Sequence, residues 1–291
     1  MPGELLGVLA PTFVCAALGW SWGRWGPGYD RALITALISN IGAPCLVFSQ
    51  LTALEVEAAA LLQMAIGAGL ALLSFATAGA IILRVWGLPA HTYLAPLMFG
   101  NAGNLGLSLC LFAFGRDGLA LGVCFYAVMA TVHFTLGILI WSGRLSLGEL
   151  LRNPLFGAAL LAILVLASEL RVPLWIRSTT EVLGGLTIPL MLLTLGVSIG
   201  ELKVGRLPRT IGLSLLRLGM GALVGFGLAE VLGFEGTSRG VLILQCSMPA
   251  AVFNYLFAQR YGRSPEQVAS IVVVSTLLAF LLSPLLLARL I

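Results

Sequence analysis

The sequence predicts an all-α polytopic membrane protein with ten transmembrane helices in two inverted five-helix repeats. Hydrophobic residues make up 59% of its 291 residues and charged residues only 10%, whereas about a quarter of a typical soluble chain is charged. Apolar runs of membrane-spanning length occur about ten times, and the two halves resemble each other. This composition excludes a soluble globular domain, a disordered chain and a nucleic-acid-binding module.

The predicted spans are separated by short connections that contain Gly, Pro or charged residues. The spans are 5–22, 32–52, 58–83, 92–114, 118–141, 154–170, 178–200, 210–232, 238–259 and 266–288. The first repeat covers 1–145 and the second 146–291. No appended soluble domain is expected, so the function must reside in the helices and their connections.

The distribution of Lys and Arg predicts that both termini lie outside the cell (inner) membrane. With the N-terminus outside, five basic residues fall in outer connections and ten in inner ones. The inner residues are Arg24, Arg31, Arg84, Arg144, Arg152, Lys203, Arg206, Arg209, Arg260 and Arg263. The N-terminus lacks the positive region of a signal peptide, so we expect the first apolar run to be retained as a span.

The two halves match at an offset of about 145 residues. Residues 41–46 in the second span resemble residues 186–191 in the seventh, and residues 111–113 in the fourth resemble residues 256–258 in the ninth. Because five is odd, the second unit would enter the membrane from the opposite side. Such inverted repeats are typical of secondary transporters with a site near the midplane. The alternative is a duplicated helical bundle without a transport role.

Two predicted spans are interrupted in their middle. Residues 100–106 of the fourth span read Gly-Asn-Ala-Gly-Asn-Leu-Gly, and residues 247–251 of the ninth read Ser-Met-Pro-Ala-Ala. Glycine weakens a helix interior, and proline removes a backbone hydrogen bond. Unwound backbone at membrane depth is tolerated only where protein buries it or where it lines a cavity. The two breaks therefore mark the predicted binding site.

Each break would create a half-helix whose N-terminus favours an anion. Asn104 would cap the second half of the fourth span or donate its amide to a carboxylate, and Pro249 suits the first turn of the other half-helix. Alternatively, the asparagines satisfy only the broken backbone and neighbouring helices. The predicted substrate-binding residues are Asn101, Gly103, Asn104, Ser108, Ser247, Pro249 and Asn254.

Four other residues within the spans are candidates for structural or functional roles. Pro44 and Pro189 predict kinks in the second and seventh spans. Arg217 is either a charge partner for the substrate, as intramembrane arginines often are, or extends to the inner surface. His133 serves packing or an interhelical hydrogen bond rather than a proton relay. The five cysteines form no CxxC pair, and neither disulfides, metals nor cofactors are predicted.

The chain resembles the auxin efflux carrier family over essentially its whole length. The motifs that carry the resemblance are residues 100–107 with 111–115, residues 187–196, and residues 248–255. The resemblance implies that helices 4 and 9 cross at their breaks. It also implies a scaffold of helices 1, 2, 6 and 7, a mobile unit of helices 3–5 and 8–10, an elevator-like motion, and a homodimer through the scaffold. Substrates of this family are organic anions, such as auxin in plants and dicarboxylates in bacteria.

The chain departs from the family at Ser108. The family motif often reads Gly-Leu-Pro, whereas here Gly106-Leu107 precedes Ser108, so the fourth-span break rests on glycine alone. The related bile-acid-type carriers couple to sodium through carboxylates. Because no Asp or Glu lies near either break, sodium coupling is not expected, and H⁺ remains the candidate coupling ion.

These observations predict a secondary active transporter of a small organic anion with elevator-type alternating access. The alternative is a passive uniporter or channel for organic anions, which the same repeat would build. An enzyme is not expected, because the spans lack clustered nucleophiles, acid/base groups or metal ligands. The lipid bilayer is the expected environment, and no nucleic-acid partner is predicted.

Overall fold

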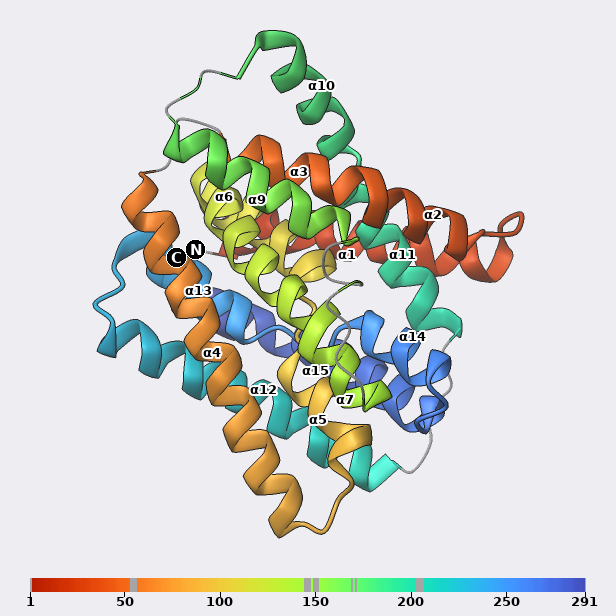
Figure 1. Cartoon of the computed structure of the whole chain (residues 1–291). Helices are drawn as coiled ribbons and strands as arrows, with labels where there is room; N and C mark the ends of the chain where they lie inside the picture. The colour runs from red at the N-terminus through yellow and green to blue at the C-terminus, as the bar shows by residue number, and fades with distance from the viewer. Residues whose placement is uncertain are drawn as a thin grey trace.

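The computed structural model describes residues 2–52, 57–143, 148, 152–168, 170, 172–201 and 207–290, where the regular elements are helical (Figure 1). The elements are α1 (Pro2–Trp25), α2 (Arg31–Leu37), π-helix η1 (Ile38–Gly42), α3 (Ala43–Leu51), α4 (Ala58–Val85), α5 (Ala90–Met98), π-helix η2 (Ala102–Leu107), α6 (Ser108–Val132), π-helix η3 (His133–Gly137), α7 (Ile138–Ser142), α9 (Pro154–Ala167), α10 (Leu174–Gly185), α11 (Thr187–Glu201), α12 (Leu207–Val231), α13 (Gly236–Cys246), α14 (Val252–Arg260) and α15 (Pro265–Leu287).

Six helical segments of the described chain are long and apolar enough to cross a membrane. They are Arg31–Leu51, Ala59–Val85, Ala102–Ser142, Leu174–Gly200, Pro208–Val231 and Pro265–Leu287. A polytopic membrane protein is therefore confirmed, whereas the number ten and the inverted repeat stay predictions. The number of separate spans depends on interruptions within these six segments. Segment Ala102–Ser142 contains Gly115, whose φ of 66° and ψ of −152° are non-helical, at the predicted junction between the fourth and fifth spans.

The orientation in the membrane also stays a prediction. Of the ten cations assigned to inner connections, Arg144, Lys203 and Arg206 lie outside the described residues.

Helices α1 and α11 pack closely because small residues lie in their interface. A Cβ atom on Gly196 would overlap the carbonyl oxygen of Ala16, and one on Gly19 would overlap that of Leu193. In a membrane, such small residues let helix backbones approach each other and gain dispersion contacts. Helix α3 packs against α9 and α10, so α1, α3, α9, α10 and α11 contribute to one set of contacts.

The second and seventh spans are continuous helical segments whose geometry changes next to their prolines. Helix α3 begins at Ala43, directly after η1, and α11 begins at Thr187 after a turn at Leu186. Pro44 follows π-helix η1 and Pro189 follows the turn at Leu186, so each proline lies beside a local change of helical geometry, as expected where a proline removes a backbone hydrogen bond. The second and seventh spans contact each other here, since a Cβ on Gly42 would lie 2.6 Å from Thr187 Oγ1.

A second set of helices consists of α4, α5, α6, α12, α13 and α15. Helix α13 is buried within it, and residues 241–244 have no exposed surface. Helix α12 lies close to α13, because a Cβ on Gly225 would lie 3.0 Å from Ile243 Cα. This set carries both halves of the interrupted fourth span and the first half of the ninth, and α14, the second half of the ninth, packs against α15.

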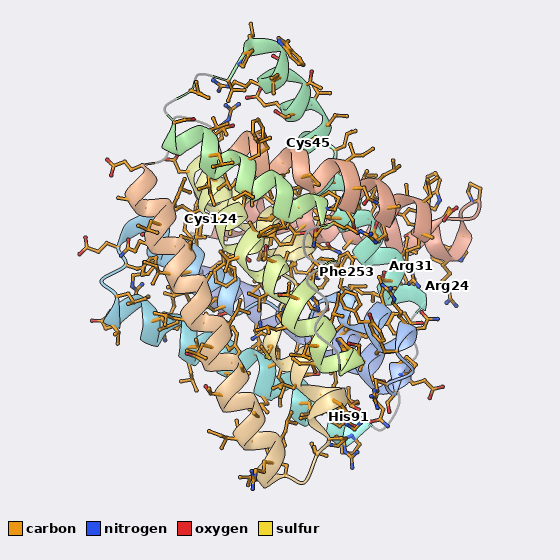
Figure 2. The ribbon with its side chains drawn as sticks, viewed as in Figure 1. Arg24, Arg31, Cys45, His91, Cys124 and Phe253 are labelled. Carbon is orange, nitrogen blue, oxygen red and sulfur yellow. The ribbon has the colours of Figure 1, made fainter. Side chains whose placement is uncertain are left out.

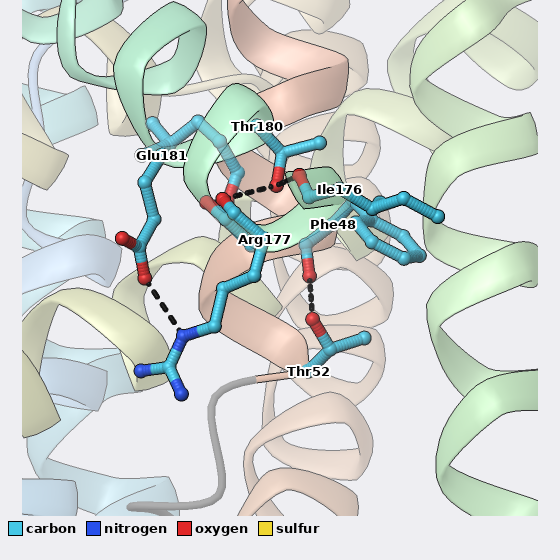
Figure 3. Close-up of polar contacts among 8 residues, drawn as sticks. Phe48, Thr52, Ile176, Arg177, Thr180 and Glu181 are labelled. Carbon is cyan, nitrogen blue, oxygen red and sulfur yellow. Dashed lines mark hydrogen bonds and ion pairs between the residues drawn. The ribbon is translucent and has the colours of Figure 1, made fainter. Parts of the chain in front are cut away.

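Helix α10 lies at one end of the molecule (Figure 1), and its polar contacts are local. Arg177 Nε donates to Glu181 Oε1 at 3.0 Å, and the Thr180 hydroxyl donates to the carbonyl of Ile176 at 2.9 Å (Figure 3). On neighbouring α3, the Thr52 hydroxyl donates to the carbonyl of Phe48 at 2.7 Å. An exposed i,i+4 ion pair such as Arg177–Glu181 contributes only about 0.3–0.5 kcal/mol, which makes Arg177 a suitable control position.

Candidate functional site

The chain is interrupted at both predicted break segments, although two details differ from the sequence interpretation. The second half of the fourth span begins at Ala102, so Asn104 lies inside η2 and does not cap it. Asn101 occupies the cap position, without a side-chain capping bond. Helix α14 begins at Val252, so Pro249 lies in extended chain before it rather than in its first turn. The physical reason is that Pro249 pairs with the other break.

The two breaks cross and pair as short antiparallel segments. Gly100 and Ala250 form an isolated β-bridge. The N–H of Asn101 donates to the carbonyl of Pro249 at 2.6 Å, and the N–H of Ala251 donates to the carbonyl of Phe99 at 3.0 Å. Each break therefore satisfies backbone groups that the other leaves open, as a low-dielectric interior requires. The crossing implied by the family resemblance is present.

Two side chains complete the hydrogen bonds of the crossing. Asn254 is fully buried, and its Nδ2 donates to the carbonyl of Phe99 at 3.0 Å. Ser275, on α15, accepts the N–H of Ala250 at 3.1 Å through its hydroxyl oxygen. Asn254 thus satisfies broken backbone through Nδ2, whereas its Oδ1 has no hydrogen-bond partner and its binding role stays a prediction. Ser275 was not anticipated, because serine within an apolar span carries no distinctive signal.

Of the other predicted residues, some form local hydrogen bonds or packing contacts, and one has a buried polar atom without a hydrogen-bond partner. The hydroxyls of Ser108 and Ser247 donate within their own helices, to the carbonyls of Leu105 at 2.8 Å and Ile243 at 2.7 Å. Asn101 is buried, and its Nδ2 has no hydrogen-bond partner. Gly103 makes room for the ring of Tyr126, which would lie 2.9 Å from an added Cβ.

Arg217, on α12, lies directly against the crossing. Only 1% of the residue is exposed, so it does not extend to the surface. A Cβ on Gly100 would overlap its terminal nitrogen, and its Cζ lies 4.7 Å from the centre of the Phe75 ring. Its Nε and one terminal nitrogen have no hydrogen-bond partner. The crossing therefore has a buried positive charge beside it, which stabilises nearby negative charge.

Asn104 faces a narrow pocket, which we call the interface pocket, with α2, η1 and α11 on one side and η2 and α14 on the other. Its lining comes from α2, η1, η2, α11 and α14: Arg31, Thr35, Ile38, Asn104, Thr194, Ser198, Val252, Phe253 and Leu256. Figure 2 shows Arg31 and Phe253 near each other. The pocket volume is about 20 Å³, enough for a single water molecule. This space is too small for an organic anion.

The interface pocket combines one cation with amide and hydroxyl groups. Arg31 is flanked by Thr35, Asn104, Thr194 and Ser198 as pocket-lining residues, and the Ser198 hydroxyl is buried without a partner. Such a set of donors suits a carboxylate, because charge-assisted hydrogen bonds are the strongest available. Sequence reasoning treated Arg31 only as a marker of orientation and missed Thr194 and Ser198.

One pocket-lining residue, Thr194, forms a hydrogen bond to the segment before α2. The hydroxyls of Tyr29 and Thr194 lie 2.7 Å apart, which connects the α1–α2 connection to α11. Burial raises the pKa of the Tyr29 phenol, and the bond to Thr194 opposes this by less. The phenol is therefore neutral at physiological pH.

His133 packs next to the crossing, among aromatic rings and near the side chain of Asn254. Its ring stacks on Phe99 with centroids 4.0 Å apart and meets Phe257 edge-on at 5.3 Å. Its Nε2 is buried without a hydrogen-bond partner. Within the described residues, no group of three or more His, Cys, Asp or Glu side chains is arranged to hold a metal, and all five cysteines are free thiols.

Comparisons with known proteins identify transporters. A family described as "Membrane transport protein" matches residues 142–287, half of the chain. An uncharacterized transporter from Methanothermobacter thermautotrophicus is 27% identical over 273 residues, which cover 88% of both chains. A second uncharacterized transporter, from Methanocaldococcus jannaschii, is 27% identical over 196 residues, which cover 63% of both chains.

Proposed function

Because this chain belongs to the membrane transport protein family, that of the auxin efflux carriers, we propose that it is a secondary active transporter of a small organic anion. It is a transport protein and not an enzyme. The observation that carries the choice of substrate is the interface pocket, where the guanidinium of Arg31 and the amide of Asn104 line the same space. We place the substrate carboxylate between these two groups.

Two further features favour an anion at this position. The half-helices that begin at Ala102 and Val252 start beside the crossing, so their positive ends lie near the pocket. The buried charge of Arg217 lies on the crossing itself. Each feature favours negative charge more strongly in a dry interior than in water.

The proposed mechanism is elevator-type alternating access. The pocket lies between α2, η1 and α11 on one side and η2 and α14 on the other. At about 20 Å³ it is too small for an organic anion, so these two sides must move apart for binding. The helices around α1 and α11, with Arg31 on neighbouring α2, would form the scaffold and dimer contact, and the set around α4 and α12 would carry the crossing and Asn104, with H⁺ as the candidate coupling ion.

The experiment is uptake of radiolabelled mono- and dicarboxylates into proteoliposomes under an imposed pH gradient or membrane potential. A thermal-shift screen of purified protein against the same compounds selects the substrate, because a ligand stabilises the state it binds. We expect Arg31→Gln and Asn104→Ala to lower uptake at least tenfold. Arg177→Gln, which removes an exposed guanidinium far from the pocket, is the matched control and should leave uptake unchanged.

Unchanged transport by both folded pocket variants would overturn the placement of the carboxylate. Accumulation against a gradient supports active transport, whereas equilibration without accumulation identifies a passive uniporter or channel.

A further inference from the structure

A larger cavity lies next to the interface pocket, and we call it the arginine cavity. Its volume is about 340 Å³, within the size range of small-molecule sites. It is lined by Ser39, Asn40, Tyr126, Phe134, Ile138, Arg152, Asn153, Pro154, Leu155, Phe253, Phe257 and Arg260. It shares only Phe253 with the described lining of the interface pocket.

The lining of the arginine cavity has a charged part and an aromatic part. Arg152 and Arg260 contribute two guanidinium groups, and none of the described lining residues is acidic. The aromatic part is a cluster in which Phe134 meets Phe253 and Phe257 edge-on, with ring centroids 5.7 and 5.6 Å apart. A ligand with a carboxylate and an apolar body matches both parts, because guanidinium binds carboxylate and the rings bury apolar surface.

The arginine cavity lies between two exposed arginines and the interface pocket. Arg152 precedes α9, Arg260 ends α14, and both side chains are largely exposed. Phe253 contacts both spaces from the first turn of α14. An anion in the arginine cavity is therefore one aromatic side chain away from the space beside Asn104 and Arg31.

Resting on the transport function proposed above, we propose that the arginine cavity is a separate entry subsite for amphipathic organic anions. Arg152 and Arg260 hold the carboxylate, and Phe134 and Phe257 hold the apolar body. Phe253 separates this subsite from the interface pocket and must rotate for the anion to pass. The subsite favours an anion with an aromatic body over a short hydrophilic one.

The test uses 3-phenylpropionate and acetate as probes, with the full-length protein. Calorimetric titration of purified protein measures binding, and proteoliposome uptake measures KM and kcat. In the Arg152→Gln/Arg260→Gln variant we expect the Kd and KM for 3-phenylpropionate to rise about tenfold, with kcat changed less than twofold. The Arg152→Lys/Arg260→Lys variant should recover most of this loss, and Arg177→Gln should behave as the unaltered protein.

Two further variants separate this subsite from the interface pocket. Arg31→Gln should lose transport and still bind 3-phenylpropionate. Phe253→Trp should lower kcat several-fold without raising Kd, because it obstructs passage rather than binding. Thermal unfolding of every variant establishes that it is folded.

The outcomes distinguish the two proposals. If 3-phenylpropionate binds the unaltered and Arg31→Gln proteins equally but no carboxylate is transported, the subsite stands and the proposed function fails. If the double arginine variant binds and transports 3-phenylpropionate like the unaltered protein, the subsite is overturned and the proposed function is untouched. Absence of binding to the unaltered protein also overturns the subsite.

Discussion

The side-chain amide of Asn254 donates to the backbone carbonyl of Phe99, which belongs to the opposite break, at 3.0 Å. The two residues are 155 positions apart in the chain, and Asn254 has no exposed surface. This bond joins the two interrupted helices through a side chain, in addition to the backbone pairs around Gly100 and Ala250.

Removal of this bond should lower stability. Asn254→Ala removes one of two hydrogen bonds to the Phe99 carbonyl, which keeps the N–H of Ala251, and we expect the free energy of unfolding to fall by about 0.5–1.5 kcal/mol. Thermal unfolding in detergent measures the loss. Ser74→Ala is the control, because the Ser74 hydroxyl bonds only to the carbonyl of Leu70 on its own exposed helix face. Equal melting temperatures for the two variants would contradict the structural role of Asn254.

Gly106 and Gln245 should be energetically coupled. A Cβ on Gly106 would overlap Gln245 Oε1, and Gln245 Nε2 donates to the carbonyl of Gly122 at 3.3 Å. Gly106→Ala should therefore destabilise the protein by about 1–3 kcal/mol, the usual penalty for overpacking. Gln245→Ala relieves the overlap, so the double variant should be more stable than the sum of single changes predicts. Additive changes in a double-mutant cycle of melting data would refute the contact.

The charge of Arg217 should matter for transport but not for folding. A buried guanidinium without hydrogen bonds at Nε carries a desolvation penalty. Arg217→Met should thus keep or raise the melting temperature, while kcat/KM for the anion falls about tenfold, or ~1.4 kcal/mol. Proteoliposome uptake and thermal unfolding of the same preparation check both parts. A strongly destabilised variant would show instead that Arg217 has a structural role.

Gly196 should tolerate no side chain in the contact between α1 and α11. Gly196→Ala would place its methyl group onto the carbonyl of Ala16, and we expect a loss of about 1–3 kcal/mol. Gly212→Ala is the matched control on α12, where nothing lies within 4 Å of an added Cβ. This control should gain about 0.5–1 kcal/mol from helix propensity. The opposite ranking of the two melting temperatures would contradict the packing of α1 on α11.

The helical, membrane-spanning character and both break positions were predictable from the sequence. Apolar composition reports burial in lipid, and Gly and Pro act on the backbone locally, so neither requires knowledge of the tertiary structure. Residues 100–106 and 247–251 were identified for this reason. The exact starts of the half-helices were not, because they depend on the pairing of Asn101 with Pro249 across the crossing.

The interface pocket was only partly predictable. Asn104 stood out as a polar residue between glycines, but Arg31 lies at the beginning of a span, where cations are common. Thr194 and Ser198 are ordinary on an apolar helix, and only the approach of α11 to η2 brings them to Asn104. Gln245 had a signal that was overlooked, since an amide inside an apolar run is unusual.

The pairing of the two breaks also bears on the return step of a transport cycle. The backbone groups of Phe99, Asn101, Pro249 and Ala251 bond to one another rather than to a ligand. When the substrate leaves, these backbone groups keep their hydrogen bonds. The empty site therefore has no added desolvation cost from them. In the proposed mechanism these backbone groups therefore do not oppose the return of the unloaded mobile unit.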